Sequence, residues 1–323
     1  MRVAVLFGGR SSEHEISLES GRAVAGGLRD AGHEVLEVLI ERHGRWLCDG
    51  QEVELRAGAG LLGADVAFPV LHGPFGEDGS VQGLLECLDV PYAGPSVLSA
   101  AVAMDKLICK RLLAFHGLPQ VDFCEVGERG WRELAMAMPR PLWVKPSRLG
   151  SSVGISRVSS AESELGEAVE LALRHDPRVI IEADAGGAEV ECSVIGNLEL
   201  EISLPGLISY PGAEWYDYEA KYSSGGMELV VPAPLDQPTT ERVRSLAGRV
   251  FRAVDGRGLA RCDFFVRDSG EVLVNEINTI PGFTATSVFG KLFEASGIPY
   301  PDLCDRLVRL ALERHETEQA YRF

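Results

Sequence analysis

Apolar runs and a helical pattern alternate at the start of the chain. Residues 3–7 form a β-branched and aromatic run of the kind found in buried strands, and residues 16–32 carry apolar positions at helical spacing. Strand patterns follow at residues 34–39 and 66–71. A strand, a helix and a strand in succession indicate a βαβ unit. We therefore predict an α/β fold that begins with a parallel sheet.

Helix and strand patterns continue to the C-terminus. Residues 97–112 predict a single helix, which Gly117 and Pro119 end. Ser159 and Glu162 have capping-box spacing for a further helix. The other expected elements are strands at residues 142–145, 179–182, 189–195 and 272–277, and a closing helix that begins at Pro301. The length of the chain suggests two or three domains, and the breaks between these elements predict boundaries near residues 95–105 and 185–200.

Composition and charge narrow the class of protein. The chain has 323 residues, 46% of them hydrophobic, and a formal net charge of −17. This charge argues against nucleic-acid binding and against an anionic membrane surface. Seven cysteines without a C-x-x-C pair favour reduced thiols in a cytoplasmic protein. The first apolar run is too short for a signal peptide, so we expect none.

Polar residues occupy alternate positions on two predicted C-terminal strands. Arg261 and Asp263 are two residues apart on one strand, and Glu276 and Asn278 on the other, so each pair points to one face. If the strands are neighbours, Asp263, Glu276 and Asn278 converge as the oxygen ligands that Mg²⁺ prefers. A strand with a solvated polar face would have the same alternation. The Pro-Gly turn at residues 279–284 favours the binding site.

A Gly/Ser loop at residues 145–154 is a candidate phosphate site. Backbone N–H groups and the hydroxyls of Ser151 and Ser152 can hold a phosphate, and Lys145 adds positive charge. The loop lacks the Walker A pattern, and an ordinary turn would also explain it.

Three further loops carry polar side chains and are candidate parts of a binding site. Residues 8–15 join a strand to a helix without the dinucleotide motif, and Glu13 there would face a cation. Residues 71–79 contain His72 among three glycines, and residues 215–222 mix aromatic and charged side chains. The alternative interpretations are helix capping for residues 8–15, a structural histidine for His72, and a surface loop with packed aromatic side chains for residues 215–222.

Eight segments in order resemble the D-alanine–D-alanine ligase family of the ATP-grasp superfamily. They are FGGRSSEHEISLESG, LHGPFGEDGSVQGLLE, AMDKLICK, VKPSRLGSSVGI, EVECSVIGN, YDYEAKY, RCDFF and NEINTIPGFTATS. The resemblance covers nearly the whole chain. It implies three domains, which are an N-terminal parallel-sheet domain at residues 1–100 and the two lobes of an ATP-grasp fold at residues 101–185 and 186–323. The two lobes would hold ATP between them.

The resemblance also implies which residues hold ATP and metal. Those that would contact the nucleotide are Lys106, Lys145, Ser152, Glu182, Glu189, Lys221 and Phe265. Asp263, Glu276 and Asn278 would bind two Mg²⁺ or Mn²⁺ ions, with Glu276 bridging them.

For the substrates, the resemblance implies a separate set of contacts. Glu13 would pair with the ammonium of the first D-alanine, and the hydroxyls of Ser151 and Tyr222 would be linked to Glu13. Arg261 and the backbone N–H of Gly282 would contact the oxyanion of the tetrahedral intermediate that forms when the two substrates are joined. Ser287 would receive the carboxylate of the second substrate, beside His72 and Val288.

The implied reaction joins two D-alanines for peptidoglycan precursor synthesis in the cytoplasm. The first carboxylate would take the γ-phosphate of ATP and form an acylphosphate, which the amine of the second D-alanine would attack. An acylphosphate hydrolyses in water, so residues 207–228 are expected to form a covering lid. We expect a homodimer.

Departures from the family pattern keep some details open. Ala183 replaces a lysine that could reach adenine, Leu149 replaces a carboxylate of some relatives, and Val288 replaces a larger residue. Tyr222 favours D-alanine over D-lactate as acceptor, because relatives that make the depsipeptide lack it. The alternatives are a ligase that uses D-lactate or D-serine, a two-lobed binding protein without catalysis, and a kinase that stops at the acylphosphate.

Overall fold

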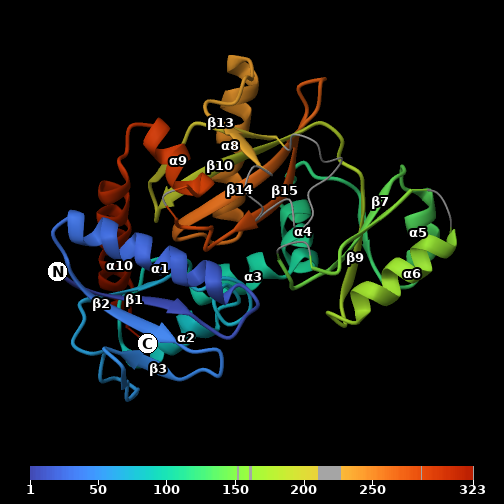
Figure 1. Cartoon of the computed structure of the whole chain (residues 1–323). Helices are drawn as coiled ribbons and strands as arrows, with labels where there is room; N and C mark the ends of the chain where they lie inside the picture. The colour runs from blue at the N-terminus through green and yellow to red at the C-terminus, as the bar shows by residue number, and fades with distance from the viewer. Residues whose placement is uncertain (151–152, 160–161, 210–226, 285, 323) are drawn as a thin grey trace.

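The structure is a computed structural model that describes residues 1–150, 153–159, 162–209, 227–284 and 286–322. Within these residues the strands form three sheets of five, four and six strands. Figure 1 shows the N-terminal sheet at the lower left, the C-terminal sheet above it, and the sheet of the middle segment at the right.

The first sheet is parallel at its centre and has the strand order β4-β3-β2-β1-β5. Its strands are β1 (Arg2–Gly8), β2 (Glu34–Ile40), β3 (Trp46–Cys48), β4 (Gln51–Glu52) and β5 (Val66–Pro69). Strand β1 pairs in parallel with β2 and β5, which confirms the predicted parallel sheet. Val3 and Val5 of β1 lie in one hydrophobic core, whereas Ala4 and Leu6 lie in another. The apolar run is continuous because both faces of the strand are covered.

Helices from both ends of the chain cover the first sheet. Helix α1 (His14–Asp30) and the closing helix α10 (Tyr300–Gln319) pack together on one face, and α2 (Ser80–Leu88) packs on the other. Arg314 of α10 is buried and donates to the carbonyl oxygens of Tyr92 and Gly94, at 2.9 and 2.8 Å. The C-terminal helix is thereby fixed to the N-terminal sheet.

The single helix predicted at residues 97–112 is wrong. The structure has two helices, α3 (Val97–Met104) and α4 (Lys106–Phe115), because Asp105 between them has extended backbone, with φ −89° and ψ 100°. Asp105 Oδ1 accepts a hydrogen bond from the Ile108 N–H at 3.2 Å and so caps α4. Gly117 follows α4 with φ +63°, consistent with the predicted end.

The second sheet has the order β6-β9-β7-β8 and is antiparallel. Its strands are β6 (Phe123–Glu125), β7 (Leu142–Pro146), β8 (Ser156–Val158) and β9 (Val179–Ala183). Helices α5 (Trp131–Ala137) and α6 (Glu162–Leu173) cover its outer face in Figure 1. The opposite face is turned toward α4 and the third sheet.

The third sheet has the order β13-β12-β10-β14-β15, with β11 beside β10. Its strands are β10 (Ala188–Gly196), β11 (Leu200–Ile202), β12 (Gly206–Ser209), β13 (Glu228–Val230), β14 (Gly258–Val266) and β15 (Val272–Asn278). Helix α8 (Gln237–Ala253) and residues of α4 share its core, and α9 (Val288–Ala295) contacts β10. Helices α2, α5, α8 and α9 and several short strands were not predicted from the sequence.

We propose that the three ranges expected from the sequence are the domains, because each sheet falls within one range. The packing nevertheless crosses these boundaries, since α10 belongs to the first core and α4 to the third. None of the helices in the described residues is long and apolar enough to cross a membrane.

The aromatic cluster around Phe283 makes a testable prediction about stability. Phe283 is 1% exposed, and its ring centroid lies 5.8, 5.1 and 5.9 Å from those of Phe68, Phe289 and Tyr300. We expect Phe283→Ala to lower the free energy of unfolding by about 3–5 kcal/mol, measured by urea denaturation. Phe115→Ala is the matched control, because Phe115 is 85% exposed. Equal effects of the two substitutions would contradict this packing.

Candidate functional site

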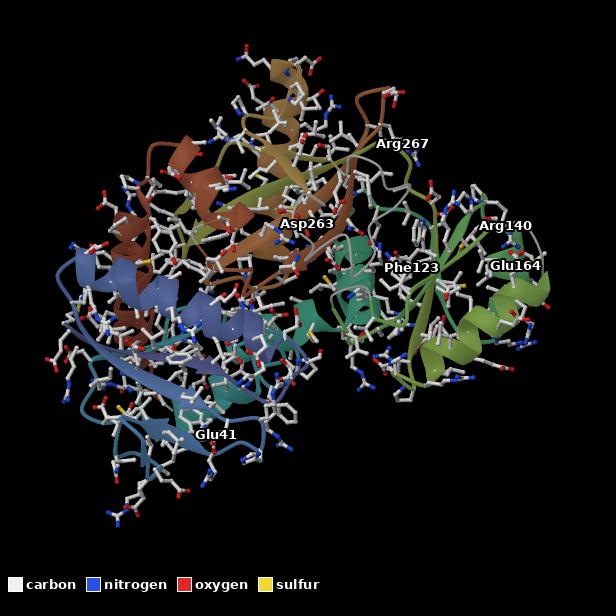
Figure 2. All side chains as sticks on the ribbon, viewed as in Figure 1. Glu41, Phe123, Arg140, Glu164, Asp263 and Arg267 are labelled. Carbon is white, nitrogen blue, oxygen red and sulfur yellow. The ribbon has the colours of Figure 1, made fainter. Side chains whose placement is uncertain are left out.

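The two polar strands predicted from the sequence are neighbours. Strands β14 and β15 pair in antiparallel register, with Arg261 opposite Asn278 and Asp263 opposite Glu276. Cys262 and Ile277 between them are buried in the core of the third sheet. The predicted division into a polar face and an apolar face is therefore confirmed. Figure 2 shows Asp263 near the centre of the molecule, where the three sheets approach one another.

Asp263 is 2% exposed and is held by several donors. Arg261 donates through Nε to Asp263 Oδ1 and through Nη2 to Oδ2, both at 2.7 Å. Asn278 Nδ2 donates to Oδ2 at 2.9 Å. Arg261 Nε also lies 2.9 Å from Glu191 Oε2 on the adjacent strand β10. Arg261 is thus a fixed cation between two buried carboxylates.

The oxygen donors fit a hard divalent cation. Asp263 and Glu276 lie opposite each other across the strand pair, and Asn278 is two residues from Glu276 on the same face. Within the described residues no group of three or more His, Cys, Asp and Glu side chains is arranged to hold a metal. The set found here has two carboxylates and the amide of Asn278, which are oxygen ligands suited to Mg²⁺.

Two cavities meet at these residues. One, of about 460 Å³, lies against the N-terminal sheet, and the other, of about 500 Å³, lies between the second and third sheets. Both volumes fall in the range of small-molecule sites. The residues that line both cavities are Lys106, Leu149, Gly150, Glu191, Arg261 and Glu276. A group bound in one cavity can therefore reach a group bound in the other.

The second cavity carries a buried ion-pair cluster. Glu182 of β9 is 3% exposed, and its Oε2 lies 2.6 Å from Lys145 Nζ on β7. Its Oε1 lies 3.1 Å from Lys110 Nζ on α4. Burial opposes ionisation of Glu182, but Lys110 and Lys145 more than offset it and lower its pKa to about 2. Burial likewise opposes the charge on Lys145, while Glu182 raises the pKa of that lysine above its ordinary value.

The wall of the first cavity contains Glu13, His72 and Glu77. His72 Nδ1 donates to the carbonyl oxygen of Ile280 at 3.1 Å, and its Nε2 lies 2.9 Å from Ser20 Oγ. Nδ1 is also 3.6 Å from Glu77 Oε1. Burial opposes protonation of His72, but Glu77 and Glu13 raise its pKa. Burial raises the pKa of Glu77, and Glu13 adds to this.

The loop after β15 closes the first cavity. Thr284 N–H donates to Ser287 Oγ at 2.9 Å, and the two hydroxyls of these residues are 2.7 Å apart. A Cβ atom at Gly282 would lie 3.1 Å from Ser287 Oγ, so a side chain there would crowd the loop. Ser287 and Val288 begin α9 and line the cavity.

Lys106 connects the cavities at the start of α4. Its Nζ donates to the Leu149 carbonyl at 2.8 Å and lies 3.6 Å from Glu276 Oε2. Asp105 before it accepts from Ser147 Oγ at 2.7 Å and from Arg178 Nη1 at 2.6 Å. The start of α4 is therefore fixed to the first residues of the Gly/Ser loop.

Every predicted site residue in the described part of the chain lines one or both cavities. The first is lined by Glu13, His72, Lys106, Arg261, Glu276, Asn278, Gly282, Ser287 and Val288, and the second by Lys106, Lys145, Glu182, Glu189, Arg261, Asp263, Phe265 and Glu276. Ser151, Ser152, Lys221 and Tyr222 lie outside the described residues, as does most of the expected lid. The individual roles of these residues stay predictions.

Some residues of the site were missed from the sequence. Glu191 follows Glu189 at strand spacing, and Glu77 belongs to the glycine-rich segment around His72, so both had a local signal. Lys110 lies one helical turn after Lys106, on the face that reaches Glu182. Asp105, Ser147 and Arg178 come from separate segments, and only the fold brings them together.

Comparisons with known proteins cover nearly the whole chain. A model described as D-ala D-ala ligase N-terminus matches residues 2–60 and 51–95, and one described as D-ala D-ala ligase C-terminus matches residues 112–309. A D-alanine–D-alanine ligase from Halothermothrix orenii is 44% identical over 97% of this chain and 98% of its own.

Solved structures agree with this match. The D-alanine-D-alanine ligase from Coxiella burnetii has a TM-score of 0.88 and 35% identity, over 99% of this chain and 96% of its own. The VanG D-Ala:D-Ser ligase from Enterococcus faecalis has a TM-score of 0.87 and 31% identity, over 96% and 99%. The matches confirm the predicted fold class, a parallel-sheet domain followed by a two-lobed ATP-grasp fold.

The buried Glu182 cluster predicts a pH-dependent contribution to stability. The pKa of Glu182 is lowered from 4.5 to about 2, so the ionised carboxylate stabilises the fold above about pH 4.5, and this stabilisation is lost as the pH falls toward 2. We expect Glu182→Gln to lower the free energy of unfolding at pH 7. The difference from the wild type should shrink to about half or less by pH 3 in urea denaturation. The control is exposed Glu294→Gln. A Glu182→Gln difference that stays constant from pH 7 to pH 3 would refute this assignment.

Proposed function

The chain belongs to the D-alanine–D-alanine ligase family, and from this premise we propose that it joins two D-alanine molecules in a reaction driven by ATP. Family membership makes the chain a ligase and implies ATP use. The observation that carries the proposal is the meeting of the two cavities at Lys106, Arg261 and Glu276. The first cavity would hold the amino-acid substrates and the second the nucleotide.

Asp263, Glu276 and Asn278 fit Mg²⁺ or Mn²⁺ and would hold it at the junction of the cavities. The bound ion would neutralise the phosphate oxygens of ATP. A carboxylate and ATP repel each other, so further cations have to lie between them. Lys106 and Arg261 line both cavities and Lys145 lines the second, which places positive charge where the two substrates meet.

In the proposed first step, a carboxylate oxygen of the first D-alanine attacks the γ-phosphorus of ATP. The bond to the β-γ bridging oxygen breaks, ADP leaves, and an acylphosphate forms. Glu13 lines the first cavity and would hold the ammonium group of this substrate, which directs its carboxylate toward the junction. Positioning of the two reactants and neutralisation of their charge supply most of the rate enhancement in such a transfer.

In the proposed second step, the amine of the second D-alanine attacks the acyl carbon. A C–N bond forms, phosphate leaves with the C–O electron pair, and the proton that the amine loses passes to the departing phosphate. Negative charge develops on the carbonyl oxygen, and the Arg261 guanidinium and the Gly282 N–H would stabilise it. Ser287 at the start of α9 would receive the carboxylate of the second D-alanine.

Water has to be excluded while the acylphosphate exists. The proposed cover is residues 207–228, of which residues 210–226 lie outside the described part of the chain. We also propose a cytoplasmic location, supported by seven cysteines that are all free thiols. The homodimer stays a prediction that light scattering can test.

The proposed function is tested by product analysis with different acceptors. Purified protein with ATP, Mg²⁺ and D-alanine should form D-alanyl-D-alanine, ADP and phosphate in equal amounts. When D-lactate or D-serine is added together with D-alanine at neutral pH, the product that contains D-lactate or D-serine should be the minor one, and D-alanyl-D-alanine the major one. ADP release without dipeptide would instead support the kinase, and faster turnover with D-lactate or D-serine would support the sister ligases.

Loss of the Glu276 carboxylate should remove most activity. Replacement of groups that only support metal ligands costs about 10- to 100-fold, so loss of a ligand itself should cost at least as much. We expect Glu276→Gln to lower kcat more than about tenfold at ordinary Mg²⁺, with partial recovery at high Mg²⁺, in a phosphate-release assay. Glu271→Gln, at the exposed β14–β15 turn, is the control. Wild-type turnover of Glu276→Gln at ordinary Mg²⁺ would count heavily against the site.

A further inference from the structure

Lys110 is a buried cation that contacts the wall of the second cavity from the side away from the cavity. Its side chain is 4% exposed, and its Nζ lies 3.1 Å from Glu182 Oε1 and 5.7 Å from the ring centroid of Phe123. Phe123 is labelled in Figure 2 beside α4, on the strand that pairs with β9. Lys110 does not line the second cavity, whereas Lys145 and Glu182 do. The carboxylate of Glu182 therefore has one lysine on each side, and only Lys145 faces the cavity.

The two lysines cannot be equivalent when a nucleotide binds. In the proposed function Lys145 contacts phosphate, yet in this structure its Nζ is 2.6 Å from Glu182 Oε2. When the phosphates arrive, the charge of Lys145 is shared between Glu182 and a phosphate or is turned wholly to the phosphate, and in either case it compensates Glu182 less. A buried carboxylate that loses its counter-ion is costly, because its charge is then neither hydrated nor compensated. Lys110 remains in contact with the other oxygen of Glu182.

We propose that Lys110 is a positioning residue that keeps Glu182 ionised and in place when Lys145 turns from Glu182 to the phosphates of the nucleotide. This inference rests on the proposed function, since it takes the second cavity as the ATP site. An ionised Glu182 only accepts hydrogen bonds, so it would offer the nucleotide an acceptor on the wall of the second cavity.

The use of lysine in this chain supports the proposal. Of 31 basic residues only five are lysines, and Lys106, Lys110 and Lys145 are three of them. Lys106 and Lys145 line the second cavity, and Lys110 reaches it through Glu182. Lysine carries a compact charge on a flexible stem, whereas arginine presents a planar fork that favours fixed bidentate contacts. The Lys110 ammonium contacts one oxygen of Glu182 and lies near the Phe123 ring, and neither contact needs the planar fork of an arginine.

Direct nucleotide binding tests the proposal without relying on turnover. Isothermal titration calorimetry with ADP and Mg²⁺ should show at least about tenfold weaker binding to Lys110→Met than to the wild type, because Lys145 is then the one counter-ion left to Glu182 among the described residues. Lys291→Met on α9 is the matched control and should bind as the wild type does. Lys110→Arg keeps the charge and should recover part of the affinity.

A double-mutant cycle separates this role from a general defect. In Glu182→Gln the carboxylate is absent, so adding Lys110→Met should change ADP affinity by less than about threefold. An equal loss in both backgrounds, or wild-type affinity in Lys110→Met, would overturn the proposal. Should Lys110→Met not fold, the comparison of Glu182→Gln with Lys110→Met/Glu182→Gln decides: equal ADP affinity supports the role, and a further loss contradicts it.

The outcome for the proposed function is read separately. The same wild-type preparation is assayed for D-alanyl-D-alanine by product analysis. ADP binding without dipeptide formation would reject the ligation and leave the Lys110 comparison intact. Dipeptide formation with unchanged ADP affinity in Lys110→Met would reject only the role of Lys110.

Discussion

The compensation of buried negative charge is the interaction on which the site depends. The chain has a net charge of −17, and Glu182, Glu191 and Asp263 are almost fully buried at its centre. Glu182 contacts both Lys110 and Lys145, and Arg261 contacts both Glu191 and Asp263. The cations that neutralise Glu182 come from α4 and β7, so the ion pairs connect a helix of the third core to the second sheet. Because a buried ion pair that loses one partner is strongly destabilised, these contacts constrain how the sheets can be placed.

The break between α3 and α4 is a consequence of the same constraint. Asp105 ends one helix, caps the next, and accepts hydrogen bonds from Ser147 and Arg178 of the second sheet and its loops. Helix α4 therefore begins where Lys106 can reach the junction of the two cavities. Lys110 follows one turn later and reaches Glu182 from the same helix. A continuous helix through residue 105 would remove the cap and change the direction in which both lysines point.

Local patterns predicted those parts of the site whose geometry is set within one strand or turn. The alternation of Arg261 and Asp263 and of Glu276 and Asn278 fixed the face of each strand, although only the structure decided that the strands are neighbours. The helix break at Asp105 was missed, because apolar spacing alone continues through it. The return of α10 to the first sheet and the position of Lys110 behind Glu182 depend on contacts between distant segments. Such contacts have no signature at either segment alone.

Arginine and lysine neutralise negative charge at the junction of the two cavities in different ways. Arg261 is fixed by two hydrogen bonds to Asp263 and by a contact with Glu191, which suits a cation that stays in place while charge develops on a nearby oxygen. Lys106 and Lys145 each contact one carboxylate through a flexible stem, Glu276 and Glu182 respectively, so they can exchange a carboxylate for a phosphate as the nucleotide enters. An exchange of this kind releases a carboxylate each time, the partly exposed Glu276 or the buried Glu182. For Glu276 the bound divalent cation would compensate that charge, whereas Glu182 does not belong to the metal set and, among the described residues, keeps Lys110 for this purpose.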